Sequence, residues 1–155
     1  MIKLHRVLCP TDFSEYSHKA VRYGCELAVA FSSELHLLHV VQNYDAIAPG
    51  SGEIFVPFTD WLPQLREQSQ QRLTGLPGPD WEPRLKVERS TRVGQAIDEI
   101  VNYAKEHEID LIVQSTHGRT GFKHFLLGSV AESIVRYAPC PVLTVRQVEH
   151  EFVEP

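Results

Sequence analysis

The chain lacks the features that mark several classes of protein. It has only three cysteines in 155 residues, Cys9, Cys25 and Cys140, and no CxxC pair. An odd number of widely spaced cysteines cannot form a closed set of disulfides, so we expect small, buried thiols in a reducing compartment. The eight histidines and the cysteines do not fall at the spacing of a zinc finger or a zinc protease. No metal site is therefore expected.

Long apolar runs and a basic excess are also absent. No segment approaches the ~20 apolar residues that a membrane-spanning helix needs, and the N-terminal MIKLHRVLCP has no apolar core of the signal-peptide kind. The formal charge is −5, from 15 basic and 20 acidic residues, whereas nucleic-acid-binding domains usually carry basic excess. We therefore expect a cytoplasmic protein that binds neither membrane nor nucleic acid.

What the chain does have is a regular alternation of strand-like and helix-like segments. This order predicts parallel strands with helices on both faces, which is a doubly wound five-stranded α/β sheet in a single domain. In the helices, Phe31, Val93 and Val135 are expected on the inner faces, and Ser129 with Glu132 has capping-box spacing. The expected strands are 6–9, 34–41, 85–90 (near an edge), 109–115 and 141–146, and the expected helices are 11–31 (capped by Asp12 or Ser14), 61–76, 93–107 and 129–138.

Two segments fall outside this alternation. Residues 43–58 are rich in proline and glycine and long for a connection, so we expect either a segment that closes over a ligand or one that contacts a second subunit. The acidic 147–155, QVEHEFVEP, is expected to be a mobile tail. The domain is therefore expected to span 1–146.

The most unusual connection is STHGRTGFKHFLLGS, residues 115–129, between the fourth expected strand and the last helix. Its glycines let backbone amides approach a ligand, and Gly128-Ser129 opens a helix whose unpaired N–H groups attract phosphate. It is neither a P-loop nor a GxGxxG loop. The open alternatives are a phosphate-binding loop and a solvated loop whose charges face water. The side chains concerned are His117, Arg119, Lys123 and His124.

Asp12 follows the first expected strand. In doubly wound sheets, ligands lie beyond the carboxyl ends of the strands, and a carboxylate there can accept hydrogen bonds from ribose hydroxyls. The alternative is a helix cap. Asp12 and His117 are candidates to polarise a water, but no Ser-His-Asp or paired-carboxylate pattern accompanies them. An enzymatic role is therefore the less favoured hypothesis.

The chain resembles the universal stress protein family over nearly all of residues 3–146, and three segments carry the resemblance. RVLCPTDFSEYSHKAVRYGCELA resembles the opening strand and helix of the family, and LHLLHVV resembles its second strand. STHGRTGFKHFLLGSVAESIVRYAPCPVLTVR resembles its signature segment. The resemblance implies a Rossmann-like sheet with strand order 3-2-1-4-5.

ATP-binding members of the family carry Gly, two residues, Gly, nine residues, Gly, then Ser or Thr. Gly118, Gly128 and Ser129 match this pattern, but Ser115 stands where the first glycine belongs. The added side chain is compatible with normal binding, with weaker binding, or with a preference for AMP or ADP over ATP.

The resemblance also implies the site residues. Gly118, Gly128, Ser129 and Val130 would hold the phosphates, next to His117 and Arg119, and Mg²⁺ is a candidate companion ion. Asp12 would bind the ribose. The remaining contacts to the nucleotide are implied for Pro10, Thr11, Val40, Val41, Gln114 and Ser115.

The function that follows from the resemblance is a nucleotide-binding stress-response module rather than an enzyme. One alternative is a member with an impaired signature that acts through protein contacts alone, and another is a slow Mg²⁺-dependent ATP hydrolase. The resemblance further implies a homodimer formed through the last strand, where an unpaired edge tends to find a partner. The residues implied at that interface are Val142, Leu143, Thr144 and Val145.

Overall fold

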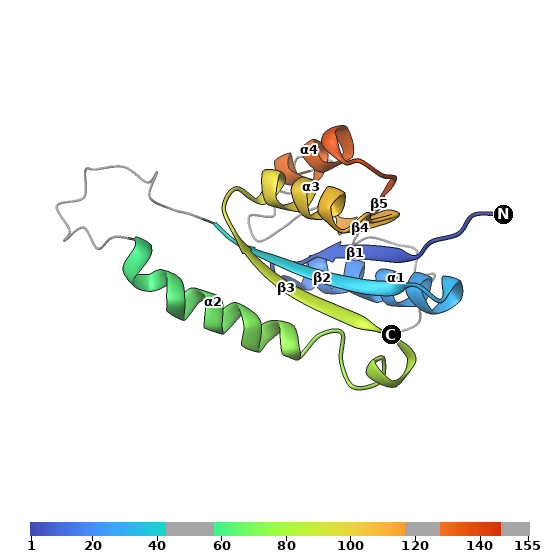
Figure 1. The fold of residues 1–155 in the computed structure, drawn as a ribbon, viewed down its shortest axis with the longest axis horizontal. Coiled ribbons are helices and arrows are strands. Elements are labelled where there is room, and N and C mark those ends of the chain that lie inside the picture. Colours follow the sequence, from blue (N-terminus) through green and yellow to red (C-terminus); the bar gives the residue numbers. More distant parts are fainter. Residues whose placement is uncertain (43–57, 117–127, 147–155) are drawn as a thin grey trace.

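The fold is a parallel sheet of five strands in the order β3-β2-β1-β4-β5 (Figure 1). The computed structural model describes residues 1–42, 58–116 and 128–146. Both the doubly wound architecture and the expected strand order are therefore confirmed. Along the chain the elements are β1 (Arg6–Pro10), α1 (Glu15–Phe31), β2 (Glu34–Val41), α2 (Phe58–Thr74), a 3-10 turn (Glu82–Arg84), β3 (Val87–Val93), α3 (Ala96–Glu106), β4 (Leu111–Ser115), α4 (Ser129–Tyr137) and β5 (Val142–Val145).

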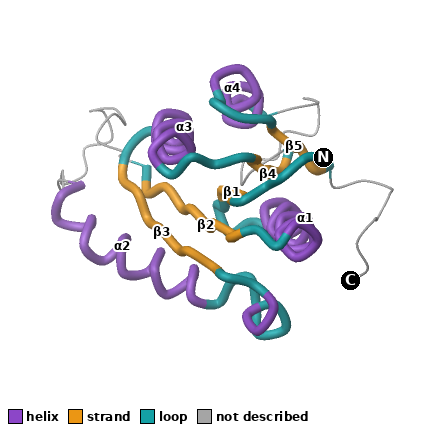
Figure 2. Tube along the Cα trace, turned by 45° about the vertical axis from the view of Figure 1, so that its right-hand side comes forward, coloured by secondary structure: helices purple, strands orange, loops and turns teal. Residues whose placement is uncertain are grey.

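Helices cover both faces of the sheet: α1 and α2 lie on one face, and α3 and α4 lie on the other (Figures 1 and 2). Side chains alternate between the two faces along each strand. In β1, Val7 and Cys9 belong to the core under α1, whereas Leu8 belongs to the core under α3 and α4. Two separate apolar cores therefore hold the helices against a sheet that is buried on both faces.

The helix starts differ in part from the expected ones. At α1 the cap is Ser14, whose side chain accepts a hydrogen bond from the Ser17 N–H, so Asp12 is not the cap. At α4 the N-cap is Gly128 and Ser129 is the first helical residue. The expected capping box is thus wrong. The physical reason is that the Gly128 N–H donates to the Thr116 carbonyl (2.8 Å), which fixes the entry to the helix one residue earlier.

Three expected inner-face residues also lie elsewhere. Phe31 is 41% exposed at the end of α1, and Val135 is 52% exposed on α4. The buried residues of α4 are instead Ala131 and Ile134, which are three residues apart on one side of the helix. Val93 belongs to β3, where it pairs with Val41 of β2, because β3 continues beyond its expected end. The expectation that this strand lies at a sheet edge is confirmed.

The sheet opens between β1 and β4. Their paired register ends at Leu8 and Ile112, although β1 continues to Pro10 and β4 to Ser115. The chain leaves β1 toward β2 on one side and returns from β3 to β4 on the other, so the strand order reverses here. A crevice at the carboxyl ends of these two strands is the expected ligand position in this class of sheet.

Several expectations fall outside the described residues. They concern most of the 43–58 segment, the tail 147–155, and the glycine-loop residues 117–127. In the described parts of the chain, no helix combines the length and the apolar character needed to span a membrane.

Candidate functional site

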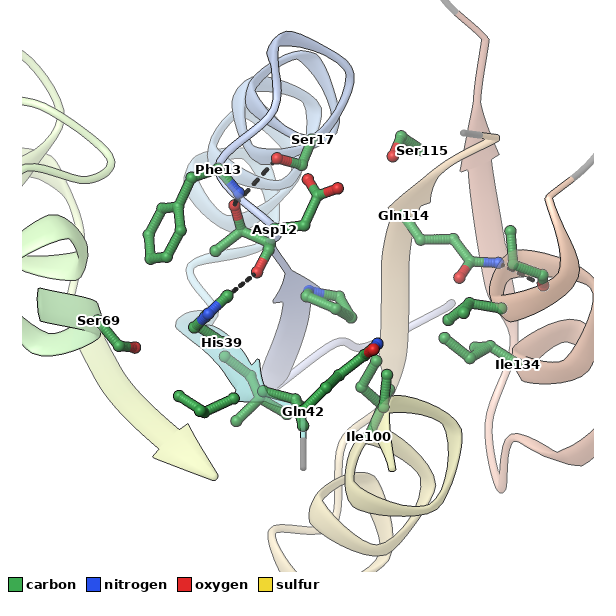
Figure 3. A pocket seen from close by; sticks show the side chains of 18 of the residues that line it. Asp12, Phe13, Ser17, His39, Gln42, Ser69, Ile100, Gln114, Ser115 and Ile134 are labelled. Atoms are coloured by element: carbon green, nitrogen blue, oxygen red, sulfur yellow. Dashed lines mark hydrogen bonds between the residues drawn. The ribbon is translucent and has the colours of Figure 1, made fainter. Parts of the chain in front are cut away.

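A cavity of about 560 Å³ lies at the carboxyl edge of the sheet, where β1 and β4 separate (Figure 3). Its wall is built from the ends of β1, β2 and β4, the first turn of α4, and parts of α2 and α3. All the predicted site residues within the described part of the chain line this cavity. Those lining it are Pro10, Thr11, Asp12, Val40, Val41, Gln114, Ser115, Gly128, Ser129 and Val130. His117, Gly118 and Arg119 are not among the described residues.

Thr11 fixes the turn between β1 and α1. Its N–H donates to the Leu38 carbonyl at 2.9 Å, and its Oγ1 accepts from the Phe13 N–H at 3.0 Å and shares a hydrogen bond with Ser17. Its own carbonyl lies 2.7 Å from Nδ1 of His39. Because a carbonyl can only accept, that nitrogen carries the proton. Thr11 is 5% exposed, so its main contribution is to position its neighbours.

Asp12 is held in one orientation by Ser14. Its Oδ1 accepts from the Ser14 N–H at 3.0 Å and from the Ser14 hydroxyl at 2.6 Å. The two bonds from Ser14 hold this oxygen, and with it the carboxylate, in place. Asp12 also lines the cavity (Figure 3). The arrangement presents an oriented carboxylate to a ligand that carries hydroxyl groups.

Next to Asp12, three side chains that contact one another form one wall of the cavity. The Phe13 ring lies 4.4 Å from the His39 ring, and Cζ of Arg72 lies 4.1 Å from the centre of the same Phe13 ring. Phe13 has a positive φ of 62°, an uncommon backbone conformation for a non-glycine residue. The hydrogen bond from its N–H to Thr11 holds that conformation. All three side chains line the cavity.

Val40 offers backbone groups to the crevice. The pairing of β1 with β2 ends at Pro10 and Leu38, while β2 continues to Val41 alongside β3. Alternate residues of a strand direct their N–H and C=O to the same side. Since the Leu38 carbonyl accepts from Thr11 on the β1 side, those of Val40 point to that side as well. One donor and one acceptor therefore lie where β1 has already ended.

The first turn of α4 forms the opposite wall. The Gly128 N–H is already used by Thr116, and the first bond of the helix runs from the Glu132 N–H to the Gly128 carbonyl. The amides of Ser129, Val130 and Ala131 precede that bond, and Gly128 provides no side-chain cap. Of the predicted phosphate-binding amides within the described residues, Gly128 is therefore already bonded, and Ser129 and Val130 remain as donors.

Gln114 attaches this turn to the sheet. Its side-chain amide donates to the Ala131 carbonyl at 2.9 Å, and Gln114 is 4% exposed. Thr116 adds a second connection, because its N–H donates to the Val145 carbonyl at 3.1 Å while its carbonyl holds Gly128. The first turn of α4 is thus positioned by β4 on the cavity side.

Charge is sparse in the cavity. Among the described residues that line it, Asp12 and Arg72 are the only acidic and basic side chains apart from His39. Within the described ranges, no three His, Cys, Asp or Glu side chains are grouped so as to hold a metal ion. The site therefore combines one carboxylate, helix-terminal amides, free strand-edge groups and apolar side chains, which suits a ligand with hydroxyl groups, an aromatic or apolar part and negative charge.

The sequence did not predict every residue that lines the cavity. Phe13, His39, Gln42, Ser69 and Arg72 line the cavity without having been predicted there. For His39, the available signal was its position near the carboxyl end of β2. No signal in the sequence pointed to α2.

The fold and the crevice define a doubly wound α/β domain with a polar-edged cavity at its switch point. The chain belongs to the universal stress protein family, whose model matches residues 3–146. A universal stress protein from Methanocaldococcus jannaschii is 32% identical over 149 residues, which cover 94% of this chain and 84% of the relative.

Solved structures have the same fold. The structure of a second M. jannaschii universal stress protein matches with a TM-score of 0.75 and 26% identity, covering 96% of this chain and 100% of that one. Two more distant structures have TM-scores of 0.59. One is a universal stress protein in complex with cAMP, at 23% identity, and it covers 93% of this chain and 98% of that one. The other is a universal stress protein from Archaeoglobus fulgidus in complex with dAMP, at 20% identity and the same coverage.

Proposed function

We propose that this chain is a cytoplasmic stress-response module that binds an adenine nucleotide and does not act chiefly as an enzyme. The observation that carries the proposal is the meeting of three features in one cavity: the Asp12 carboxylate, the open backbone of Val40, and the unpaired amides at the start of α4. The solved relatives that contain cAMP and dAMP support the choice of an adenine nucleotide. The free, buried thiols of Cys9 and Cys25 fit a reducing compartment.

The base is proposed to lie against the end of β2. Adenine carries both a donor, its amino group, and acceptor ring nitrogens, and Val40 offers the complementary acceptor and donor. Ile100 of α3 and Gln42, which follows β2, both line the cavity (Figure 3). The apolar side chains of Val41 and Ile100 also line the cavity, and they provide surface for the flat faces of a base.

The ribose and phosphates are proposed to extend from Asp12 toward α4. The carboxylate of Asp12 would accept from ribose hydroxyls, as carboxylates at strand ends do in this class of sheet. The amides of Ser129 and Val130 would donate to phosphate, and the positive end of the helix dipole adds to that attraction. His117, Gly118 and Arg119 are proposed to complete the phosphate contacts, and Mg²⁺ is proposed to accompany the longer phosphate chains.

Ser115 is proposed to affect the preference of the site among AMP, ADP and ATP. It lines the cavity at the end of β4, where the family signature has glycine. Its side chain takes space beside the phosphate path, so AMP or ADP is proposed to bind at least as tightly as ATP. Hydrolysis of ATP would need a base and an aligned water, and the cavity offers Asp12 as its one described carboxylate.

We also propose that two copies pair through β5. It is the last strand on its side of the described sheet, and Leu143 on it is 38% exposed. Val135 and Tyr137 of the neighbouring α4 are 52% and 59% exposed. An open strand edge beside exposed apolar side chains is suited to association with a second copy.

Mass spectrometry of ligand released from the purified protein, followed by calorimetric titration with AMP, ADP and ATP, tests the proposal. We expect an adenine nucleotide to be released or to bind, and Asp12→Asn to weaken binding by about tenfold or more, because a charged acceptor is lost. Asp80→Asn is the matched control, since Asp80 is exposed and does not line the cavity. A wild-type protein that releases no nucleotide and produces no heat would instead support the member that works through protein contacts alone.

A further inference from the structure

Helix α2 supplies the cavity with a cation that the family signature does not contain. Arg72 lies in the last turn of α2 and lines the cavity. It is the one Lys or Arg among the described lining residues. Its guanidinium rests on the Phe13 ring at 4.1 Å, directly beside the turn that carries Asp12.

Arg72 differs from four other described arginines in having no acidic partner within the described residues. Arg6, Arg89, Arg92 and Arg136 each form an ion pair with a glutamate, whereas the recorded interaction of the Arg72 side chain is its stacking on Phe13. Stacking occupies the flat face of a guanidinium and leaves its N–H edge available. That edge is the part that binds phosphate or carboxylate through two parallel hydrogen bonds.

The backbone that carries Arg72 is firmly attached to the sheet. Arg89 of β3 donates from Nε to the carbonyls of Leu73 (3.1 Å) and Leu76 (3.0 Å). Leu73 is 2% exposed, and the hydroxyl of Ser69 lies 2.8 Å from that of Thr91. Arg72 is thus presented from a fixed turn, which lowers the cost of ordering its side chain against a ligand.

We propose that Arg72 binds a phosphate group of the nucleotide, which makes α2 part of the binding site. The inference rests on the proposed function and deepens it. Ser69 of α2 and Ile134 of α4 lie on opposite sides of the cavity (Figure 3). The guanidinium and the α4 amides therefore attract negative charge from two sides. Because the 5′ phosphates are proposed to extend toward α4, the phosphate at Arg72 is either a separate phosphate on the ribose or a 5′ chain that runs toward α2 instead.

The test is calorimetric titration of wild type, Arg72→Gln and Arg72→Lys with adenosine, AMP, ATP and adenosine 3′,5′-bisphosphate. We expect Arg72→Gln to weaken binding of a phosphorylated ligand by about tenfold while adenosine changes by less than about twofold. Arg72→Lys should weaken binding less than Arg72→Gln does, because lysine keeps the positive charge although it cannot form a bidentate contact. Arg66→Gln is the matched control on the same helix, since Arg66 is exposed and does not line the cavity.

The ligands separate the two sources of phosphate. If Arg72→Gln weakens the binding of AMP and ATP, Arg72 binds the 5′ chain. If it weakens only the binding of the bisphosphate, Arg72 binds a phosphate on the ribose. An equal loss of affinity for adenosine would overturn the inference, because Arg72 would then act only by packing on Phe13. Unchanged affinity for every ligand would overturn it as well. If wild type binds no adenosine compound, the proposed function fails together with the inference, whereas wild-type binding that survives Arg72→Gln removes the inference alone.

Discussion

Gly24 allows α1 to pack closely on β1. A Cβ built at this position would overlap Sγ of Cys9, which is fully buried. We expect Gly24→Ala to lower the free energy of unfolding by about 1–3 kcal/mol, because overpacking a core forces neighbouring atoms to shift. Urea unfolding followed by circular dichroism measures the change.

A second glycine and a double variant provide the controls. At Gly75 the nearest atom to a new Cβ is 3.5 Å away, an ordinary contact, so Gly75→Ala should change stability by less than about 0.5 kcal/mol. Gly24→Ala in a Cys9→Ala background should cost little, because the overlapping sulfur is gone. The packing explanation would be refuted by an equal loss in both backgrounds.

His36 links stability to pH. It is 4% exposed on the α3 face of β2, and its Nδ1 lies 3.0 Å from the Tyr103 hydroxyl. Its Nε2 has no hydrogen-bond partner among the described residues, although Oε2 of Glu34 lies 4.0 Å away. Burial lowers the pKa of His36 below its ordinary value of 6.5, and His107 and Arg6 act in the same direction, while Glu34 and Glu88 oppose them. The folded protein therefore resists the proton that the unfolded chain accepts.

The sign of the effect follows from that difference in proton binding. Below pH 6.5 the unfolded state binds more protons at this position, so the free energy of unfolding should fall as the pH decreases toward the lowered folded pKa. Urea unfolding between about pH 7 and about pH 5 should show this fall in wild type and a shallower one in His36→Gln. Equal slopes in the two proteins would show that His36 is not the responsible group.

Among the elements, α2 depends most visibly on a single side chain. Arg89 bonds two carbonyls at the end of this helix and also reaches Glu82 at 2.6 Å. We expect Arg89→Gln to destabilise the protein by about 1–3 kcal/mol, because two partly buried carbonyls lose a charged donor. Hydrogen exchange should show faster opening of α2 than of α1 in this variant.

Arg136→Gln is the comparison for this element. Arg136 forms an exposed pair with Glu132 on α4 at 3.4 Å, and such pairs contribute about 0.3–0.5 kcal/mol. If Arg89→Gln lowers the free energy of unfolding no more than Arg136→Gln does, the bonds from Arg89 do not stabilise α2 as proposed.

Elements and site residues differed in how far the sequence could predict them. The alternating pattern predicted the five strands and four α-helices of the described residues, though not the 3-10 turn at Glu82–Arg84. The ends of these elements depended on single tertiary bonds, such as the one from Gly128 to Thr116 that displaced the cap from Ser129. Site residues at strand ends, such as Asp12 and Val40, could be predicted because the carboxyl ends of parallel strands meet at one edge. Arg72 could not, since its place depends on how α2 crosses that edge.

At the scale of the whole molecule, the β5 edge should control assembly. We expect wild type to sediment as a dimer at micromolar concentration and Leu143→Lys to sediment as a monomer, because a charge would be buried where the two edges meet. Phe31→Lys is the control, since Phe31 is also exposed, at 41%, but lies at the end of α1. A monomeric wild type would refute the dimer proposal without affecting the nucleotide proposal.

The central claim is that amides at the start of α4 and at the end of β2 contact one bound adenine nucleotide. Amide ¹H–¹⁵N NMR spectra recorded during titration with AMP test it most directly. We predict large, saturable shifts at Ser129, Val130 and Val40, with amides at the opposite end of the sheet unchanged. Saturating nucleotide that leaves these three amides unmoved would contradict the account.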